Sequence, residues 1–397
     1  MLPPEYLIGV ADKLVQVYAA VEDEIVADAA RRLVKMGYVS ETTEWQLVKG
    51  HQVGLFTKDV QKALASASGK SEKEIMQLLA EAGMEALKYD DAIYLLAGLT
   101  PLPLSECPAL QAILLQGADD LTKLLGNFTQ TRAKTCEVAF RNLCDKAWLQ
   151  ILSGAYDPET AIRRVINELA KQEIAKIAYP SGHQSGMEHA VRRAVTTGVN
   201  QSIAKLQLQR AADMGCNLVE VTSHAGARPD HAKWQGRVYC ITGKHKKYKN
   251  LKDATGYGTG PGLCGWNCYH NFYPYFEGLS TPSFSRDPSK DAGRSNKQDY
   301  ENQQKQRYYE RQIREAKKEC VALNAAYQAA DGALKESLKE DFNRAALKLK
   351  RREAKMEEFM KETGRTRLRE REQSPGFGHS VSSRAVWAKR KADQQKP

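Results

Sequence analysis

A segment rich in histidine, cysteine and glycine, residues 222–274, constrains the fold of this 397-residue chain more than any other feature. It contains four of the eight histidines, three of the eight cysteines, eight of the 28 glycines and two of the five tryptophans. Glycine is favoured where the backbone takes positive φ or approaches another group closely. A plain helical bundle does not need such a concentration, so we expect a specific irregular module here.

The rest of the chain is predicted to be mainly helical. Apolar residues recur at three- and four-residue steps from Leu7 to Ala29, which predicts one helix over residues 1–36. A capping-box pattern predicts that a second helix opens at Ser71. Further helices are expected over about 109–125, 131–152, 158–178 and 187–213. The chain is therefore predicted to be α+β and predominantly α-helical.

Three short strands are expected inside the module. The Val-rich, alternating segment 217–222 predicts the first, and segments 237–241 and 271–276 predict the others. Pro274 cannot donate to a ladder, which suggests that the third strand lies at a sheet edge. A short helix is expected at about 229–234.

Five consecutive regions follow from these patterns. They are a helical N-terminal region 1–180, a core region 181–280 that contains the module, a linker 281–297, a long helix 298–362 and a basic tail 363–397 that we expect to be disordered. The long helix has a heptad pattern with a stutter near Asp331-Gly332. Its apolar stripe requires a partner helix, either folded back in the same chain or in trans, which would give a homo-oligomer.

Positive charge is concentrated at the C-terminal end. Residues 286–397 contain 28 Lys and Arg against 18 Asp and Glu, whereas residues 1–285 are almost neutral. This asymmetry indicates an anionic partner, most simply nucleic acid, although a solvated charged helix would have a similar composition. The residues predicted to contact double-stranded DNA without sequence preference are Lys348, Lys350, Arg351, Arg352, Lys355, Arg365, Arg367, Arg369 and Arg371.

Five residues of the module are candidate metal ligands. They are His224, His231, Cys264, Cys268 and His270. A structural zinc site needs four such groups around one point, and a loop-rich module with short strands could use a metal as a staple. The spacing is not that of a standard zinc finger. The interpretation that we favour makes the cysteines small buried hydrophobes and the histidines hydrogen-bonding groups, with no cofactor and with zinc as the alternative.

Catalytic chemistry is less well supported. A thiolate pair built from Cys264 or Cys268 with a histidine would need an orienting group and an oxyanion site, and the sequence shows neither. The glycines of Gly256–Gly260 are followed by Pro261 rather than by the Gly-Lys-Ser/Thr of a phosphate-binding loop. We expect instead that they let Trp266 and Tyr257 pack close to the backbone. The chain is predicted not to be an enzyme.

Several motifs of the module resemble one known family. They are His224-Ala-Gly-Ala-Arg-Pro-Asp-His231, Trp234-Gln-Gly236, Thr255-Gly-Tyr-Gly-Thr-Gly260, Gly262-Leu-Cys-Gly-Trp-Asn-Cys268 and His270-Asn-Phe-Tyr-Pro274, with an upstream helix at 192–201. Together they resemble the phage minor capsid protein 2 family, which is related to the Mu F-like head morphogenesis proteins. Among the candidate ligands, the resemblance singles out His231, Cys268 and His270.

The resemblance implies a structural protein of a tailed bacteriophage. Such proteins are virion components present in few copies; they associate with the portal protein and other head proteins at the portal vertex or capsid interior, and can bind DNA. Lacking a secretory signal and any apolar run long enough for a bilayer, the chain is expected in the host cytoplasm during assembly and then in the head, without a membrane partner. The alternatives are a zinc-dependent nucleic-acid-binding or nuclease module and a coiled-coil scaffold.

Overall fold

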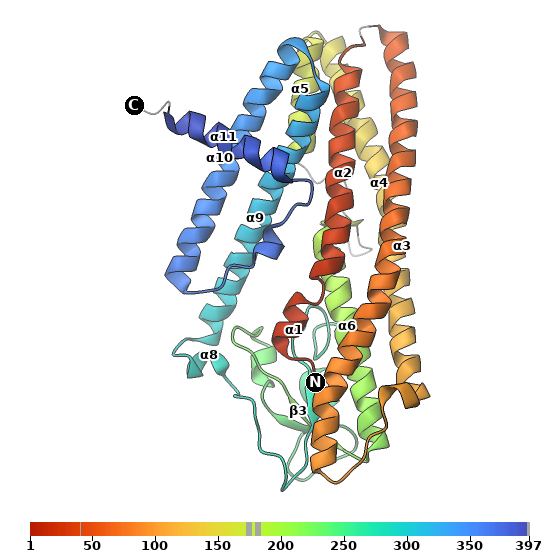
Figure 1. Cartoon of the computed structure of the whole chain (residues 1–397), viewed down its shortest axis with the longest axis vertical. Coiled ribbons are helices and arrows are strands. Elements are labelled where there is room, and N and C mark those ends of the chain that lie inside the picture. Colours follow the sequence, from red (N-terminus) through yellow and green to blue (C-terminus); the bar gives the residue numbers. More distant parts are fainter. Residues whose placement is uncertain (40, 172–176, 179–183, 395–397) are drawn as a thin grey trace. The chain divides into compact units, whose positions relative to one another are not determined.

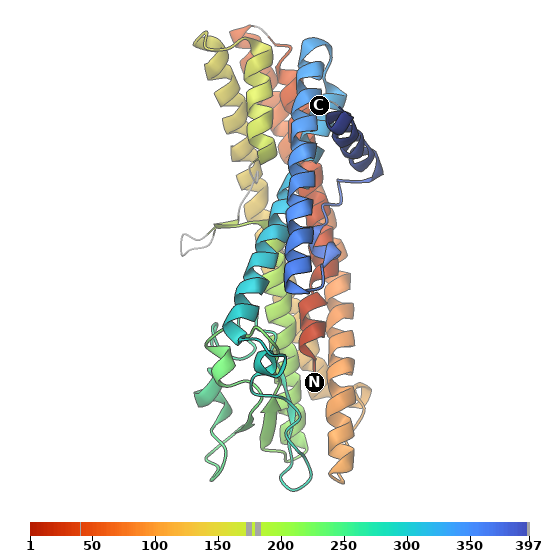
Figure 2. The same ribbon diagram turned by 90° about the vertical axis from the view of Figure 1, so that its left-hand side faces the viewer.

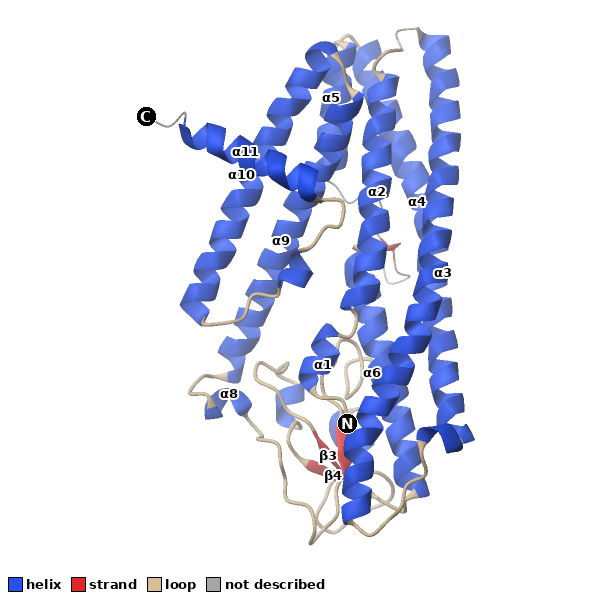
Figure 3. Cartoon of the chain, viewed as in Figure 1, coloured by secondary structure: helices blue, strands red, loops and turns tan. Residues whose placement is uncertain are grey.

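The computed structural model describes residues 1–39, 41–171, 177–178 and 184–394. Most of them are helical, as Figures 1 and 3 show, which confirms the predicted fold class. The α-helices are α1 Pro4–Gly9, α2 Asp12–Met36, α3 Thr42–Leu96, α4 Pro108–Leu152, α5 Pro158–Lys171, α6 Met187–Asp213, α7 Leu251–Thr255, α8 Pro288–Asp291, α9 Asn296–Ala329, α10 Gly332–Thr363 and α11 His379–Gln394. The 3-10 helices are η1 Leu104–Glu106, η2 His231–Lys233 and η3 Arg369–Glu372.

The chain divides into two units that are each discontinuous in sequence. Unit 1 contains residues 1–14, 69–125 and 191–305, and unit 2 contains residues 15–68, 126–190 and 306–397. The division differs from the five consecutive regions expected from the sequence, because the long helices α2, α3, α4, α6 and α9 contribute residues to both units. No helix of the described ranges combines the length and apolar character that a membrane span requires.

Unit 1 contains a three-stranded antiparallel sheet in the order β4-β3-β5. Its strands are β3 Leu218–Val221, β4 Val238–Cys240 and β5 Phe272–Pro274, and a separate two-residue pair joins β1 Ile177–Ala178 to β2 Gln184–Ser185. The three strands lie where the sequence predicted them. Pro274 is in an edge strand, paired with Val219, as its missing N–H requires.

The loops of the module approach one another too closely for side chains. A Cβ at Gly262 would lie 2.0 Å from the carbonyl oxygen of Gly256, and one at Gly260 would lie 2.6 Å from the indole ring of Trp266. The prediction that glycine lets Trp266 pack against the backbone is thus confirmed. Cys264 and Asn267 also take positive φ, of 58° and 50°, so the backbone here is tightly wound.

The helix predicted to start at Ser71 does not start there. Ser71 is buried in the interior of α3, a single helix of 55 residues. No proline interrupts residues 42–96, so the helix continues on both sides of Ser71. A capping box acts at the first turn of a helix, and Ser71 is not at a helix end. For the same reason the two helices expected over 109–125 and 131–152 form one helix, α4.

The helix predicted over 298–362 is a hairpin of two helices, α9 and α10. The break falls at the stutter, where Gly332 takes a φ of +55° and ends the continuous helix. The two helices lie side by side in both Figures 1 and 2. Ile313 of α9 packs with Leu349, Met356 and Phe359 of α10 in one buried cluster. The apolar stripe is therefore covered within the chain, and the basis for an oligomer through this helix is lost.

The tail, which the sequence predicts to be disordered, has helices and packed loops through residue 394 in this structure. Helix α11 packs on α10, and Val381, Ala385 and Ala388 are buried in the same cluster as Leu338 and Phe342. Three apolar residues spaced four and three apart form one face of a helix. The low hydrophobicity of the tail obscured this short apolar face.

Candidate functional site

Three of the predicted metal ligands meet in the buried core of unit 1. His231 is in η2, whereas Cys268 and His270 are in the loop that leads into β5. The Nδ1 atoms of His231 and His270 are 3.4 Å apart, and Sγ of Cys268 lies 3.7 Å from the first and 3.6 Å from the second. None of the three residues is more than 2% exposed. We refer to them as the His-Cys-His cluster.

The outer nitrogens of both imidazoles have their own partners. Nε2 of His270 is 2.9 Å from Oε1 of Gln235, and Nε2 of His231 is 2.8 Å from the carbonyl oxygen of Pro261. An oxygen partner places the proton on Nε2 and leaves the Nδ1 lone pair directed into the cluster. At His231, Nη2 of Arg228 also lies 2.8 Å from Nε2 and can only donate, so its two neighbours favour opposite tautomers.

Burial shifts the protonation of all three groups towards neutrality. It lowers the pKa of His231 to about 4 and that of His270 well below its usual range. It raises the pKa of the Cys268 thiol to about 11. The cause is the same for all three shifts, because a charged group loses its hydration in such a core. A nucleophilic cysteine needs a lowered pKa and access to substrate, so Cys268 does not have the properties of a catalytic thiol.

The other two predicted ligands, Cys264 and His224, are near the cluster but not in it. Cys264 is buried in the apolar core and its thiol contacts the carbonyl oxygen of His270 at 3.7 Å. Nδ1 of His224 is 3.0 Å from the carbonyl oxygen of Ala225, and its ring centroid lies 4.5 Å from that of His270 with the rings tilted by 32°. These two residues fit the interpretation as a packed hydrophobe and a hydrogen-bonding imidazole.

Asn200 supports the cluster and was not predicted. Its Nδ2 donates to the carbonyl oxygens of Cys268 and His270 at 3.0 and 2.9 Å, and its Oδ1 accepts from Asn271. The side chain is fully buried in α6. The helical motif at 192–201, which contains Asn200, is part of the family resemblance. That motif was the signal in the sequence that could have identified Asn200. Asn200 fixes the backbone that carries two of the three ligands.

Most of the basic residues predicted to contact DNA are engaged within unit 2. Five make intramolecular hydrogen bonds or ion pairs and a sixth is buried: Lys348 with Glu319, Lys350 with Glu353, Arg352 with the Gln312 carbonyl, Arg365 with Gln306, Arg367 with Glu372, and Arg371. Arg351 and Lys355 on α10 and Arg369 in η3 are exposed. Three of the predicted nine are thus exposed and outside these internal contacts.

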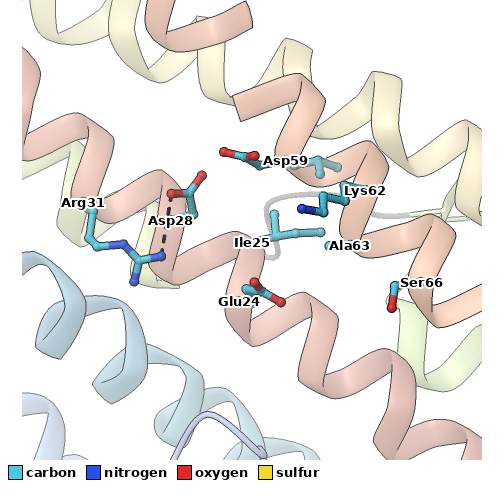
Figure 4. A pocket seen from close by; sticks show the side chains of 9 residues that line it. Glu24, Ile25, Asp28, Arg31, Asp59, Lys62, Ala63 and Ser66 are labelled. Atoms are coloured by element: carbon cyan, nitrogen blue, oxygen red, sulfur yellow. Dashed lines mark ion pairs between the residues drawn. The ribbon is translucent and has the colours of Figure 1, made fainter. Parts of the chain in front are cut away.

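A surface pocket of about 350 Å³ lies between α2 and α3 in unit 2. Figure 4 shows acidic and basic side chains around it, and Asp28 pairs with Arg31 at 3.6 Å. Arg32 also pairs with Asp28 and Asp59, both of which line the pocket. Two of its carboxylates are thus held in ion pairs, and it contains none of the predicted site residues.

The His-Cys-His cluster is enclosed in the packed core of the module. The sequence model of one family, phage minor capsid protein 2, matches residues 2–361. The chain belongs to this family. The match confirms the resemblance seen in the module and extends it to the helical N-terminal region and to the α9–α10 hairpin.

Two phage proteins are similar to this chain. A structural protein of Lactococcus phage LL-H is 26% identical over 290 residues, which cover 70% of this chain and 76% of that protein. A structural protein of Lactococcus phage mv4 is 42% identical over 76 residues, 19% of this chain and 58% of that protein. No solved structure matches the chain. The protein is thus a structural component of a phage capsid, which implies other head proteins as partners.

Proposed function

We propose that this minor capsid protein docks on the portal protein and neighbouring head proteins at the portal vertex or capsid interior and contacts packaged double-stranded DNA without sequence preference. The observation that carries the DNA contact is the exposed cationic group Arg351, Lys355 and Arg369 in the basic C-terminal region of a capsid-family protein. Cations contact phosphates by charge, which suits a protein next to packaged DNA of any sequence.

The proposed contact is weak and sensitive to salt. If three phosphates are neutralised, the slope of log affinity against log salt is about −2.7. The test measures binding of the full chain to duplex DNA over a range of salt concentrations. Exchanging Arg351, Lys355 and Arg369 together for glutamine should remove most of the affinity and flatten the slope. None of these side chains is buried, so the fold should be retained.

A matched variant controls for net charge. Lys58, Lys62 and Lys70 are exposed on α3, and exchanging them for glutamine removes the same charge elsewhere in the chain. We expect this variant to bind DNA almost as the wild type does. Equal losses in the two variants, or no retention of the wild type on DNA at low salt, would refute the proposed contact.

The position in the head is tested separately on purified particles. Mass spectrometry with chemical cross-linking should find this protein in far fewer copies than the major capsid protein and cross-linked to the portal protein. A copy number equal to that of the major capsid protein, or cross-links confined to the outer capsid surface, would contradict the proposed position.

The buried cluster argues against the alternative of a zinc-dependent nuclease. Such an enzyme exposes its metal-bound water to the phosphodiester. His231, Cys268 and His270 are at most 2% exposed, and their outer nitrogens and backbone face packed protein groups. A polynucleotide cannot reach this site without unfolding of the module.

A further inference from the structure

We propose that His231, Cys268 and His270 bind one zinc ion through Nδ1, Sγ and Nδ1, and that the ion fastens η2 to the loop before β5. The proposal does not depend on where the protein lies in the capsid or on whether it contacts DNA. It concerns only unit 1, which contains all three residues.

The spacing of the three ligand atoms is that of a tetrahedral zinc site. Zinc bonds of about 2.05 Å to nitrogen and 2.3 Å to sulfur at tetrahedral angles place two nitrogens about 3.3 Å apart and nitrogen and sulfur about 3.6 Å apart. The observed separations are 3.4 Å between the nitrogens and 3.6 and 3.7 Å from nitrogen to sulfur. One ion placed among these three atoms therefore reaches all of them at bonding distance.

A direct hydrogen bond explains the spacing less well. Hydrogen bonds from a ring N–H are usually 2.7–3.2 Å long, so a Nδ1–Nδ1 separation of 3.4 Å is long for one. At His270 the oxygen of Gln235 places the proton on Nε2, so its Nδ1 can only accept. The same amide oxygen also accepts from the backbone N–H of His224, which fixes its orientation.

The surroundings supply the support that metal-bound imidazoles usually have. Ligating histidines nearly always donate their second N–H to a carbonyl or carboxylate oxygen. Gln235 and Pro261 provide those oxygens at 2.9 and 2.8 Å. Arg228 opposes this arrangement, since it can only donate to Nε2 of His231. Its side chain is partly exposed and would turn away when that nitrogen carries the proton.

The ligand set selects zinc and leaves one position for water. Two imidazoles and one thiolate suit zinc among the common divalent ions, because hard cations such as magnesium and calcium prefer oxygen ligands. Within the described residues, no fourth histidine, cysteine or carboxylate atom joins the cluster. A water molecule would take the fourth position, so this site would differ from structural sites that four protein ligands close. Because the ligands come from segments more than 30 residues apart, the ion would stabilise a module whose strands have only three or four residues.

The test uses the full chain, purified without a histidine tag. Elemental analysis should find about one zinc per chain, and cobalt in its place should give the thiolate-to-metal absorption band of a single cysteine ligand. Cys268→Ser should lose the band and most of the zinc. Cys240→Ser is the matched control, because Cys240 is buried in the same module but its thiol faces the carbonyl oxygens of Gly243 and Tyr248.

If Cys268→Ser does not fold, the proposal is tested on the wild-type protein by its melting temperature with and without zinc. A chelator strong enough to remove zinc should lower the melting temperature of the wild type, and added zinc should restore it. Purified protein without zinc that neither takes up zinc nor gains stability from it would overturn the proposal. Full zinc content in a folded Cys268→Ser variant would do so as well.

Discussion

Glu22 and Arg132 form a buried ion pair in unit 2, with Oε1 of Glu22 2.6 Å from Nη2 of Arg132 and both side chains at most 2% exposed. Lys318 contacts the other carboxylate oxygen at 2.6 Å and also pairs with Glu188 at 2.8 Å. The pair joins α2 to α4, and Lys318 adds α9. Three helices that are far apart in sequence are therefore joined by charges that water cannot screen.

Replacing Glu22 by glutamine should destabilise the protein strongly. Burial alone would raise the pKa of Glu22, but Lys318 and Arg132 outweigh it and lower the pKa to about 2. The variant removes the negative charge that faces Arg132 and leaves Lys318 paired with Glu188 alone. Removing one partner of a buried ion pair costs about 3–5 kcal/mol of unfolding free energy. Because the folded pKa is depressed, this contribution is present above the ordinary value of 4.5 and is lost as pH falls towards 2.

Urea unfolding at neutral and acidic pH measures this effect. Glu137→Gln is the control, since Glu137 makes a 2.6 Å pair with Arg141 on the exposed surface of α4. Exposed pairs contribute about 0–1 kcal/mol. Similar losses in the two variants would show that burial does not strengthen the Glu22 pair.

The carboxyl group of Asp23 should make the protein less stable as the pH rises from about 4 to about 6. Burial raises the pKa of Asp23 from 3.8 to about 6, although Lys318 and hydrogen bonds from Ser374 and Gly376 act in the opposite direction. The folded state then binds more protons than the unfolded chain between these two values. Stability from this group is highest below about pH 4 and falls by at most about 3 kcal/mol as pH rises to about 6.

Asp23→Asn isolates this dependence because asparagine does not titrate in this range. The difference in unfolding free energy between wild type and variant should change with pH between about 4 and 6 and then level off. A difference that is constant over this range would show that the carboxyl group titrates normally in the folded protein.

Gly262→Ala should destabilise the module. Its Cβ would lie 2.0 Å from the carbonyl oxygen of Gly256, which is backbone and cannot swing aside. We expect a loss of about 1–3 kcal/mol, typical of overpacking. Gly54→Ala is the opposite control: Gly54 is exposed within α3 with no atom near its Cβ, so alanine should stabilise by about 0.5–1 kcal/mol. Thermal unfolding of both variants tests these two expectations. An unchanged melting temperature in Gly262→Ala would contradict the close approach of residue 262 to the Gly256 carbonyl.

Gln235→Leu should weaken zinc binding without removing a ligand. The change deletes the oxygen that accepts from Nε2 of His270, while the side chain stays 1% exposed and similar in size. Loss of such a supporting group lowers metal affinity about 10- to 100-fold. Competition with a zinc-binding dye measures the affinity. A variant that is less stable but binds zinc as tightly as the wild type would assign Gln235 to packing alone.

Local features of the sequence were sufficient for several parts of this protein. The short strands, the edge position of Pro274 and the helix α6 could be predicted, because alternation and proline act through the nearest few residues. A stutter near Gly332 was also visible, but not that the helix breaks there. The candidate ligands could also be narrowed to five, since few residue types bind transition metals. The family followed from the same motifs.

Tertiary structure alone decided which of these candidates meet. His231 and Cys268 are 37 residues apart, and their contact depends on how η2 and the loop pack around Trp234 and Asn200. Tertiary structure also decided that α10 folds back on α9 and that a small apolar face holds α11. It decided as well that six of the nine predicted DNA-contacting residues are buried or make contacts within the chain. Such outcomes depend on long-range packing, which buries apolar surface and pairs charges between segments that no local pattern connects.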